Sequence, residues 1–172
     1  MLDILVRKPV PPNWVPDNPP DLRALGVREI ALDTETTGLQ HYKGDRPIGI
    51  AVSWSVGSGG VQSYYLPWAH RPGGNLDETV VKRWCLEQLP GLTIRNLNTR
   101  FDCHMLREWG VDLAEMGCRL SDVAHGAALL DDARGSGWRR KETPFSLQAL
   151  GLDYAGMGKL EGLDPARMRD YH

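Results

Sequence analysis

The sequence predicts an α/β fold in which a mixed central β-sheet is flanked by helices. Three strand-like apolar segments come first, and strand-like and helix-like segments then alternate to the end of the chain. With 172 residues, one domain can bury roughly 70% of the surface that its unfolded chain exposes. We expect this domain to span residues 28–172, after a proline-rich arm over residues 1–27.

The arm is predicted from the density of proline between residues 8 and 20. Proline fixes φ and has no amide donor, so this stretch excludes a helix or a central strand and favours an extended, polyproline-like chain. Trp14 and Val15 are the side chains expected to attach it to the domain.

The first strand is expected over residues 27–33. The next two, over residues 48–56 and 61–66, are separated by the run Gly57-Ser58-Gly59-Gly60, which is typical of a hairpin. A short apolar segment over residues 92–95 predicts a further, buried strand.

Helices are expected where apolar residues recur with helical spacing. Pro90 ends the first of them, and Pro144 and Pro165 suit first-turn positions after the candidate N-caps Thr143 and Asp164. The predicted helices cover residues 77–89, 100–109, 122–131, 144–150 and 165–171.

Two carboxylates lie two residues apart at the exit of the first strand. Side chains at i and i+2 of a strand point to the same face, so Asp33 and Glu35 project together while Leu32 and Thr34 face the other way. Adjacent carboxylates repel each other, and a divalent cation such as Mg²⁺ or Mn²⁺ keeps both ionised. The alternative is an ordinary polar strand end.

A third carboxylate, Asp102, follows the strand over residues 92–95 and opens the next helix. Asn98 and Asp102 are four residues apart, which on a helix start aligns both on one side. The pattern therefore predicts that a second acidic element reaches the same end of the sheet.

These motifs carry a family resemblance. Asp33-x-Glu35 followed by Thr-Thr-Gly-Leu, and then Asn98-x-x-Phe101-Asp102, resemble the first two motifs of the DEDD 3′–5′ exonucleases. The similarity is greatest to the proofreading domain of family A DNA polymerases, and segments within residues 66–77 and 121–131 add to it. It covers roughly residues 28–160 and implies a ribonuclease H-like fold.

The resemblance implies removal of nucleotides from a single-stranded DNA 3′ end by phosphodiester hydrolysis. Two Mg²⁺ or Mn²⁺ ions ~4 Å apart would activate the water and stabilise the leaving 3′-oxygen. It assigns Asp33 as bridging ligand, Glu35 to the nucleophile side and Asp102 to the leaving-group side.

Four residues are expected to contact the substrate: Leu39 as a wedge between the last bases, Asn98 at the terminal nucleotide, Phe101 in the pocket wall, and Thr34 between the two carboxylates. Core packing is the alternative for Leu39 and Phe101. Thr36 and Thr37 equally suit a turn around Gly38.

The family's third motif, an Asp in Tyr-x-x-x-Asp or His-x-x-x-x-Asp, is not found. Tyr171 lies next to the last residue, and His125 precedes Asp131 with five intervening residues, so we interpret His125 as a structural residue of a packed helix. A polymerase domain or a second chain would then complete the site. Two other functions stay open: a catalytically incomplete module that binds DNA or docks a protein, and a DEDD exoribonuclease of the ribonuclease D kind.

Charge and composition limit the kinds of ligand and the cellular location that we expect for this protein. The net charge of −2 argues against an overall electrostatic grip on DNA, and residues 139–141 form the only basic cluster, interpreted as a solvated loop or a backbone contact. Three widely spaced cysteines favour neither disulfides nor zinc, and His70 and His104 are not expected to bind the catalytic ions. Without a long apolar run, a cytoplasmic protein that does not enter the membrane is expected.

Overall fold

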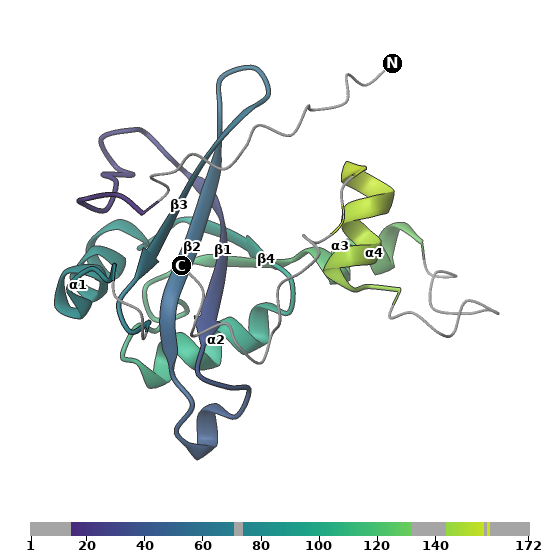
Figure 1. Cartoon of the computed structure of the whole chain (residues 1–172). Helices are drawn as coiled ribbons and strands as arrows, with labels where there is room; N and C mark the ends of the chain where they lie inside the picture. Colours follow the sequence, from purple (N-terminus) through teal and green to yellow (C-terminus); the bar gives the residue numbers. More distant parts are fainter. Residues whose placement is uncertain (1–14, 71–73, 132–143, 157, 159–172) are drawn as a thin grey trace.

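The computed structural model describes residues 15–70, 74–131, 144–156 and 158. Five strands form one sheet in the order β3-β2-β1-β4-β5, with helices beside it (Figure 1). The strands are β1 Glu29–Thr36, β2 Pro47–Val56, β3 Gly60–Pro67, β4 Thr93–Asn96 and β5 Arg119–Asp122. The predicted α/β fold with a mixed sheet is confirmed.

The sheet is mixed because β1 has a different neighbour on each side. It pairs antiparallel with β2, which forms the predicted hairpin with β3, and parallel with β4, which in turn pairs parallel with β5. The first strand begins and ends later than expected, so Asp33 and Glu35 lie within β1. The edge strand β5 was not predicted: we expected residue 122 to open a helix.

The helices largely follow the sequence pattern. They are α1 Glu78–Gln88, α2 Thr99–Glu108, α3 Val123–Leu130 and α4 Leu147–Leu150, with a 3-10 turn η1 His41–Lys43 and a π-helical turn η3 Gly151–Ala155. The prediction for α4 was wrong in its start, because Ser146 is the N-cap and accepts from the Ala149 amide at 3.2 Å. Residues 165–171 lie outside the described residues. Among the described helices, none has the length and apolar character needed to cross a membrane.

One hydrophobic core lies under one face of the sheet. Residues of β1 alternate, with Ile30 and Leu32 buried, and they pack with Val81, Trp84 and Leu106 of α1 and α2. Helix α1 begins sharply because the Asp77 carboxylate accepts hydrogen bonds from the Thr79 and Val80 amides. The two helices thereby cover the face opposite to the one carrying Asp33.

The segment that precedes β1 packs against α1. Leu22 is fully buried in the core, the Trp84 indole N–H donates to the carbonyl of Pro20 at 2.6 Å, and the Arg23 guanidinium donates to the carbonyl of Glu87 at 2.7 Å. The end of the predicted arm is thus held by specific contacts. Trp14, expected to attach it, lies outside the described residues.

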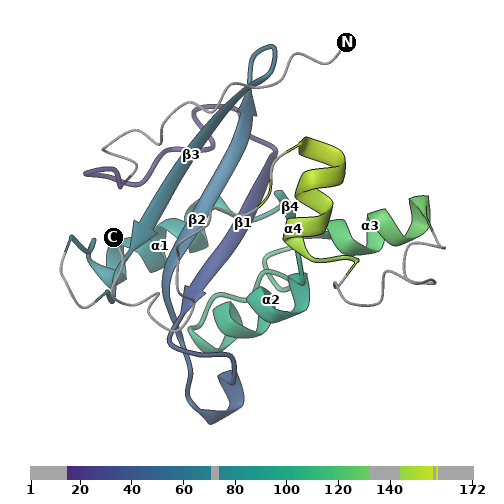
Figure 2. The ribbon, with the colours of Figure 1, turned by 45° about the vertical axis from the view of Figure 1, so that its right-hand side comes forward.

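Helix α3 differs from the packed helix that we expected. Its His125 side chain is exposed, and Leu129 and Leu130 are 88% and 78% exposed. Only Ala127 of this helix is buried against the described part of the chain. The interpretation of His125 as a packed, structural residue was therefore wrong, and Figure 2 shows α3 projecting away from the sheet.

Candidate active site at the carboxyl end of β1

The two carboxylates of β1 share one face of the sheet, as their spacing predicted. Asp33 is exposed and Glu35 is half-buried. Leu32, which precedes Asp33, and Thr34, which lies between the two carboxylates, are buried on the helix-covered side. The pleat of the strand produces this alternation. The sheet thus presents two acidic side chains beside each other on its open face.

Asp102 meets β1 from the side where α2 packs. Its carboxylate, only 2% exposed, accepts hydrogen bonds from the Thr34 amide at 3.1 Å, the Thr34 hydroxyl at 2.6 Å and the Asn96 side-chain amide at 2.7 Å. Asp102 therefore fixes the residue that lies between Asp33 and Glu35, and it anchors α2 to β1 and β4.

Burial raises the pKa of Asp102 to about 6, and the nearby charge of Asp33 adds to the rise, although the hydrogen bonds from Thr34 and Asn96 lower it. A carboxyl group with these surroundings is a strongly perturbed acid at the end of a strand. Such groups gather at functional sites more often than elsewhere.

Tyr65 on β3 is a fourth member of this site, and we did not predict it. Pairing places Glu35 opposite Gly49, and a Cβ at Gly49 would collide with the Tyr65 hydroxyl oxygen and ring. The tyrosine therefore crosses β2 above this glycine. Burial, then the charges of Glu35 and Asp33, raise the pKa of Tyr65 well above its usual range, so the phenol stays protonated and can act as a donor.

The Tyr65 hydroxyl hydrogen-bonds to His70 Nε2. His70 is itself held by Asn75, whose side chain accepts from the His70 amide at 2.9 Å and donates to the His70 carbonyl at 2.8 Å. The register of the strands places Tyr65 on the same face as the carboxylates, which the sequence motifs did not show. Ala51 of β2 lies opposite Asp33 of β1 and also opposite Tyr65 of β3, so these three residues share a face.

The loop after β1 is built by its own side chains. The Thr36 hydroxyl donates to the Gly38 carbonyl at 2.7 Å, and Asp45 accepts from the Gln40 amide at 2.8 Å and the Thr37 hydroxyl at 3.2 Å. The turn role considered for Thr36 and Thr37 is confirmed. This loop holds Leu39 with 78% of its surface exposed.

The residues that we expected to contact the substrate differ in how much of each side chain is exposed. Asn98 is exposed and is the N-cap of α2 with φ 60, whereas Asp102 is buried. Phe101 is half-buried. Thr34 is 7% exposed, and its hydroxyl is bonded to Asp102, so its side chain serves the carboxylate instead of facing solvent.

The donor chemistry fits a divalent cation at Asp33 and Glu35. Both side chains offer oxygen ligands on one face, and their negative charge is felt by Tyr65 and, from Asp33, by Asp102. In the described part of the chain, no three His, Cys, Asp or Glu side chains come together as a metal-holding group. Asp33 and Glu35 are thus the candidate ligands that share a face. Asp102, the third ligand that we predicted, accepts hydrogen bonds from Thr34 and Asn96, and its role as a ligand stays a prediction.

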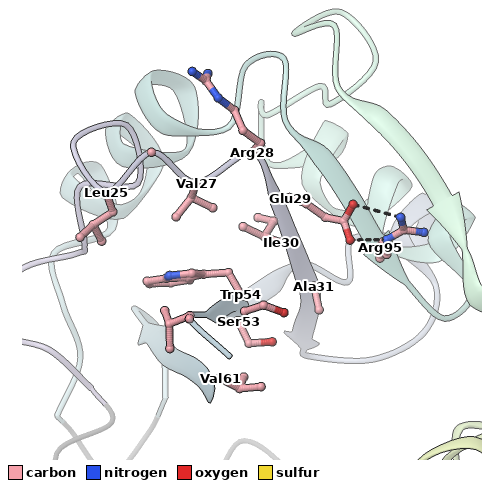
Figure 3. Close-up of a pocket in the computed structure, with 14 residues that line it drawn as sticks. Leu25, Val27, Arg28, Glu29, Ile30, Ala31, Ser53, Trp54, Val61 and Arg95 are labelled. Atoms are coloured by element: carbon pink, nitrogen blue, oxygen red, sulfur yellow. Dashed lines mark hydrogen bonds and ion pairs between the residues drawn. The ribbon is translucent and has the colours of Figure 1, made fainter. Parts of the chain in front are cut away.

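A separate cavity of about 660 Å³ lies at the other end of β1 (Figure 3). Its wall includes Leu25, Trp54 and Val61, together with the ion pair between Arg95 and Glu29. None of the predicted site residues lines it, so this cavity is distinct from the carboxylate site.

Known proteins resemble this chain in fold and, separately, in sequence. No family model matches the sequence. In fold, the chain resembles Brucella melitensis NrnC bound to pGG, with TM-score 0.53 and 20% identity over 87% of this chain and 64% of that one. It likewise resembles NrnC with bound Mg²⁺, with TM-score 0.51 and 21% identity over 87% and 63% of the two chains. This likeness concerns the fold, and the predicted ribonuclease H-like fold is thereby confirmed.

In sequence, the chain resembles two phage DNA polymerases named DpoZ. It is 31% identical over 105 residues to that of Acinetobacter phage SH-Ab 15497, matching 60% of this chain, and 26% identical over 142 residues to that of Salmonella phage PMBT28, matching 82%. The matches span 15% and 19% of the polymerases' lengths. The resemblance to DNA polymerases that the motifs indicated is confirmed in sequence.

Proposed function

We propose that the chain is a metal-dependent 3′–5′ exonuclease that removes nucleotides from single-stranded DNA ends, as the proofreading part of a DNA polymerase or a phage relative. The observation that carries the proposal is the pair Asp33 and Glu35 on the open face of the sheet, with the buried Asp102 tied to the strand between them. The sequence similarity to phage DNA polymerases supports DNA as the substrate.

Asp33 and Glu35 would contribute ligands to two Mg²⁺ or Mn²⁺ ions, and the metal would supply a water of lowered pKa and positive charge near the leaving oxygen. In the hydrolysis, the water oxygen forms a bond to phosphorus and the bond from phosphorus to the 3′-oxygen breaks. The water proton passes to solvent and the 3′-oxygen takes up a proton. The products are a nucleoside 5′-monophosphate and a shortened strand.

The other residues position these groups. Asp102 keeps Thr34 fixed, and with it the spacing of the two carboxylates, while the protonated Tyr65 offers a hydrogen-bond donor beside them. Leu39 and Phe101 would contact the last bases, and Asn98 the terminal nucleotide. A further carboxylate would come from a polymerase domain or a second chain.

The test uses a 5′-labelled, 3′-overhanging DNA oligonucleotide with Mn²⁺. Wild type should produce a descending ladder, and Asp33→Ala should lose it while staying folded; Glu87→Ala, at an exposed acid of α1, is the matched control. An undiminished ladder from Asp33→Ala would contradict the assignment. An RNA oligonucleotide of the same sequence distinguishes a DNA exonuclease from an exoribonuclease, since the 2′-hydroxyl distinguishes the substrates. If folded wild type cleaves neither the DNA nor the RNA, the alternative of a catalytically incomplete module that binds DNA or docks a protein is favoured.

A further inference from the structure

A cluster of ring side chains lies where η1, in the loop that follows β1, meets α2. The imidazoles of His41 on η1 and His104 on α2 stack with centroids 4.6 Å apart and planes 3° from parallel. Tyr42 contacts His41 edge-on at 5.5 Å. Since His104 comes two residues after Asp102, and η1 continues the loop that leaves β1, this cluster is attached to both acidic elements.

The cluster is accessible on its outer side. Tyr42 is 71% exposed, as is most of Leu39 at the start of the same loop. Figure 2 shows η1 as the blue turn beyond the end of β1, with α2 beside it. We call His41, Tyr42 and His104 the ring ledge.

Cationic side chains lie beside the ring ledge, although the chain as a whole carries a net charge of −2. Lys43 Nζ lies 5.8 Å from the Tyr42 ring centroid, and Arg100 is exposed in the first turn of α2. Burial, followed by His41, Arg100 and Arg107, lowers the pKa of His104, while Glu108 raises it. Exposed rings beside cations are the combination by which proteins bind single strands: bases stack on the rings while phosphates meet the charges.

We propose that the ring ledge binds the bases that precede the terminal nucleotide of a single-stranded DNA, with Tyr42 as the stacking side chain and Lys43 and Arg100 as phosphate contacts. The inference rests on the proposed function, because the carboxylates receive the 3′ end. The cations would offset the repulsion between the DNA backbone and the acidic site.

The experiment measures binding of a labelled eight-nucleotide oligothymidylate by fluorescence anisotropy in EDTA, where metal-dependent cleavage is absent. Tyr42→Ala should raise Kd about 5- to 20-fold, since stacking on one ring has this order of effect, and Tyr42→Phe should retain affinity. Lys43→Ala should reduce the salt dependence of binding by about one phosphate contact. Leu86→Ala and Arg83→Ala, at exposed positions of α1, are the matched controls and should bind as wild type does.

The proposal is overturned if folded Tyr42→Ala binds like wild type, if Leu86→Ala weakens binding equally, or if wild type does not bind the strand. It is also overturned if a blunt duplex of the same length, whose bases are not available for stacking, competes as well as the single strand. Because this assay involves no hydrolysis, its result is separate from that of the cleavage test: a chain that cleaves but binds independently of Tyr42 refutes only the ring ledge.

Discussion

Ionisation of Asp102 should destabilise the metal-free protein. The pKa of this carboxyl is raised from its usual 3.8 to about 6, mainly by burial. Below pH 3.8 it is neutral in both the folded and the unfolded chain. Between pH 3.8 and 6 the folded chain keeps a proton that the unfolded chain has lost, so stability falls as pH rises through the folded pKa.

The magnitude follows from the interval of about 2 pH units. At about 1.4 kcal/mol per pH unit, the free energy of unfolding should fall by about 2.5 kcal/mol between pH 3.8 and pH 7 because of this one group. Glu29, Asp77 and Asp112 have lowered pKa values and act in the opposite direction. The comparison must therefore be made against a variant that changes Asp102 alone.

The assay is urea unfolding in EDTA at several pH values for wild type and Asp102→Asn. The asparagine still accepts from Thr34 but has no charge, so the difference in unfolding free energy between the two proteins should shift by about 2.5 kcal/mol, in favour of the variant, from pH 4 to pH 7. A difference that stays constant with pH would refute the account of Asp102 as a buried acid with a raised pKa.

Two further predictions concern the packing that holds the site. Gly49→Ala forces a methyl group onto the Tyr65 hydroxyl and should destabilise the fold by about 1–3 kcal/mol in urea unfolding. Gly126→Ala in α3, where a Cβ meets nothing within 4 Å, is the control and should not destabilise the fold. Equal effects of the two substitutions would contradict the close approach of Tyr65 to Gly49. Leu106→Ala in the core should cost about 2–5 kcal/mol, against less than about 0.5 kcal/mol for the exposed Leu86→Ala, and a small loss at position 106 would mean that α2 does not pack as described.

The sequence predicted most elements because their signals are local. Alternation in β1, the glycine run of the hairpin and the capped, proline-ended α1 are each contained within a few residues. Strand β5, Arg119–Asp122, was missed because it is short and its exposed and half-buried side chains give no apolar pattern; it forms through pairing with β4. The exposure of α3 likewise depends on what packs against it, which helical periodicity does not encode.

The same distinction applies to the site. The spacing of Asp33 and Glu35 was enough to place them on one face, since the strand period decides it. Tyr65 could not be found in this way, because its position beside Glu35 depends on the register of two strand pairs and on the missing side chain at Gly49. The left-handed backbone of Asn98 was not predicted either, because asparagine adopts this conformation only in a minority of cases and the local sequence does not decide it.

The central claim is that Asp33 and Glu35 hold a divalent cation, and Mn²⁺ binding tests it most directly because it does not require a complete catalytic site. The measurement is titration of metal-free protein with Mn²⁺, followed by electron paramagnetic resonance of the free ion, for wild type, Asp33→Asn and the control Glu87→Ala. We predict that wild type and the control bind Mn²⁺ equally and that Asp33→Asn binds at least about 10-fold more weakly. Equal binding by wild type and Asp33→Asn, or no binding by wild type, would contradict the claim.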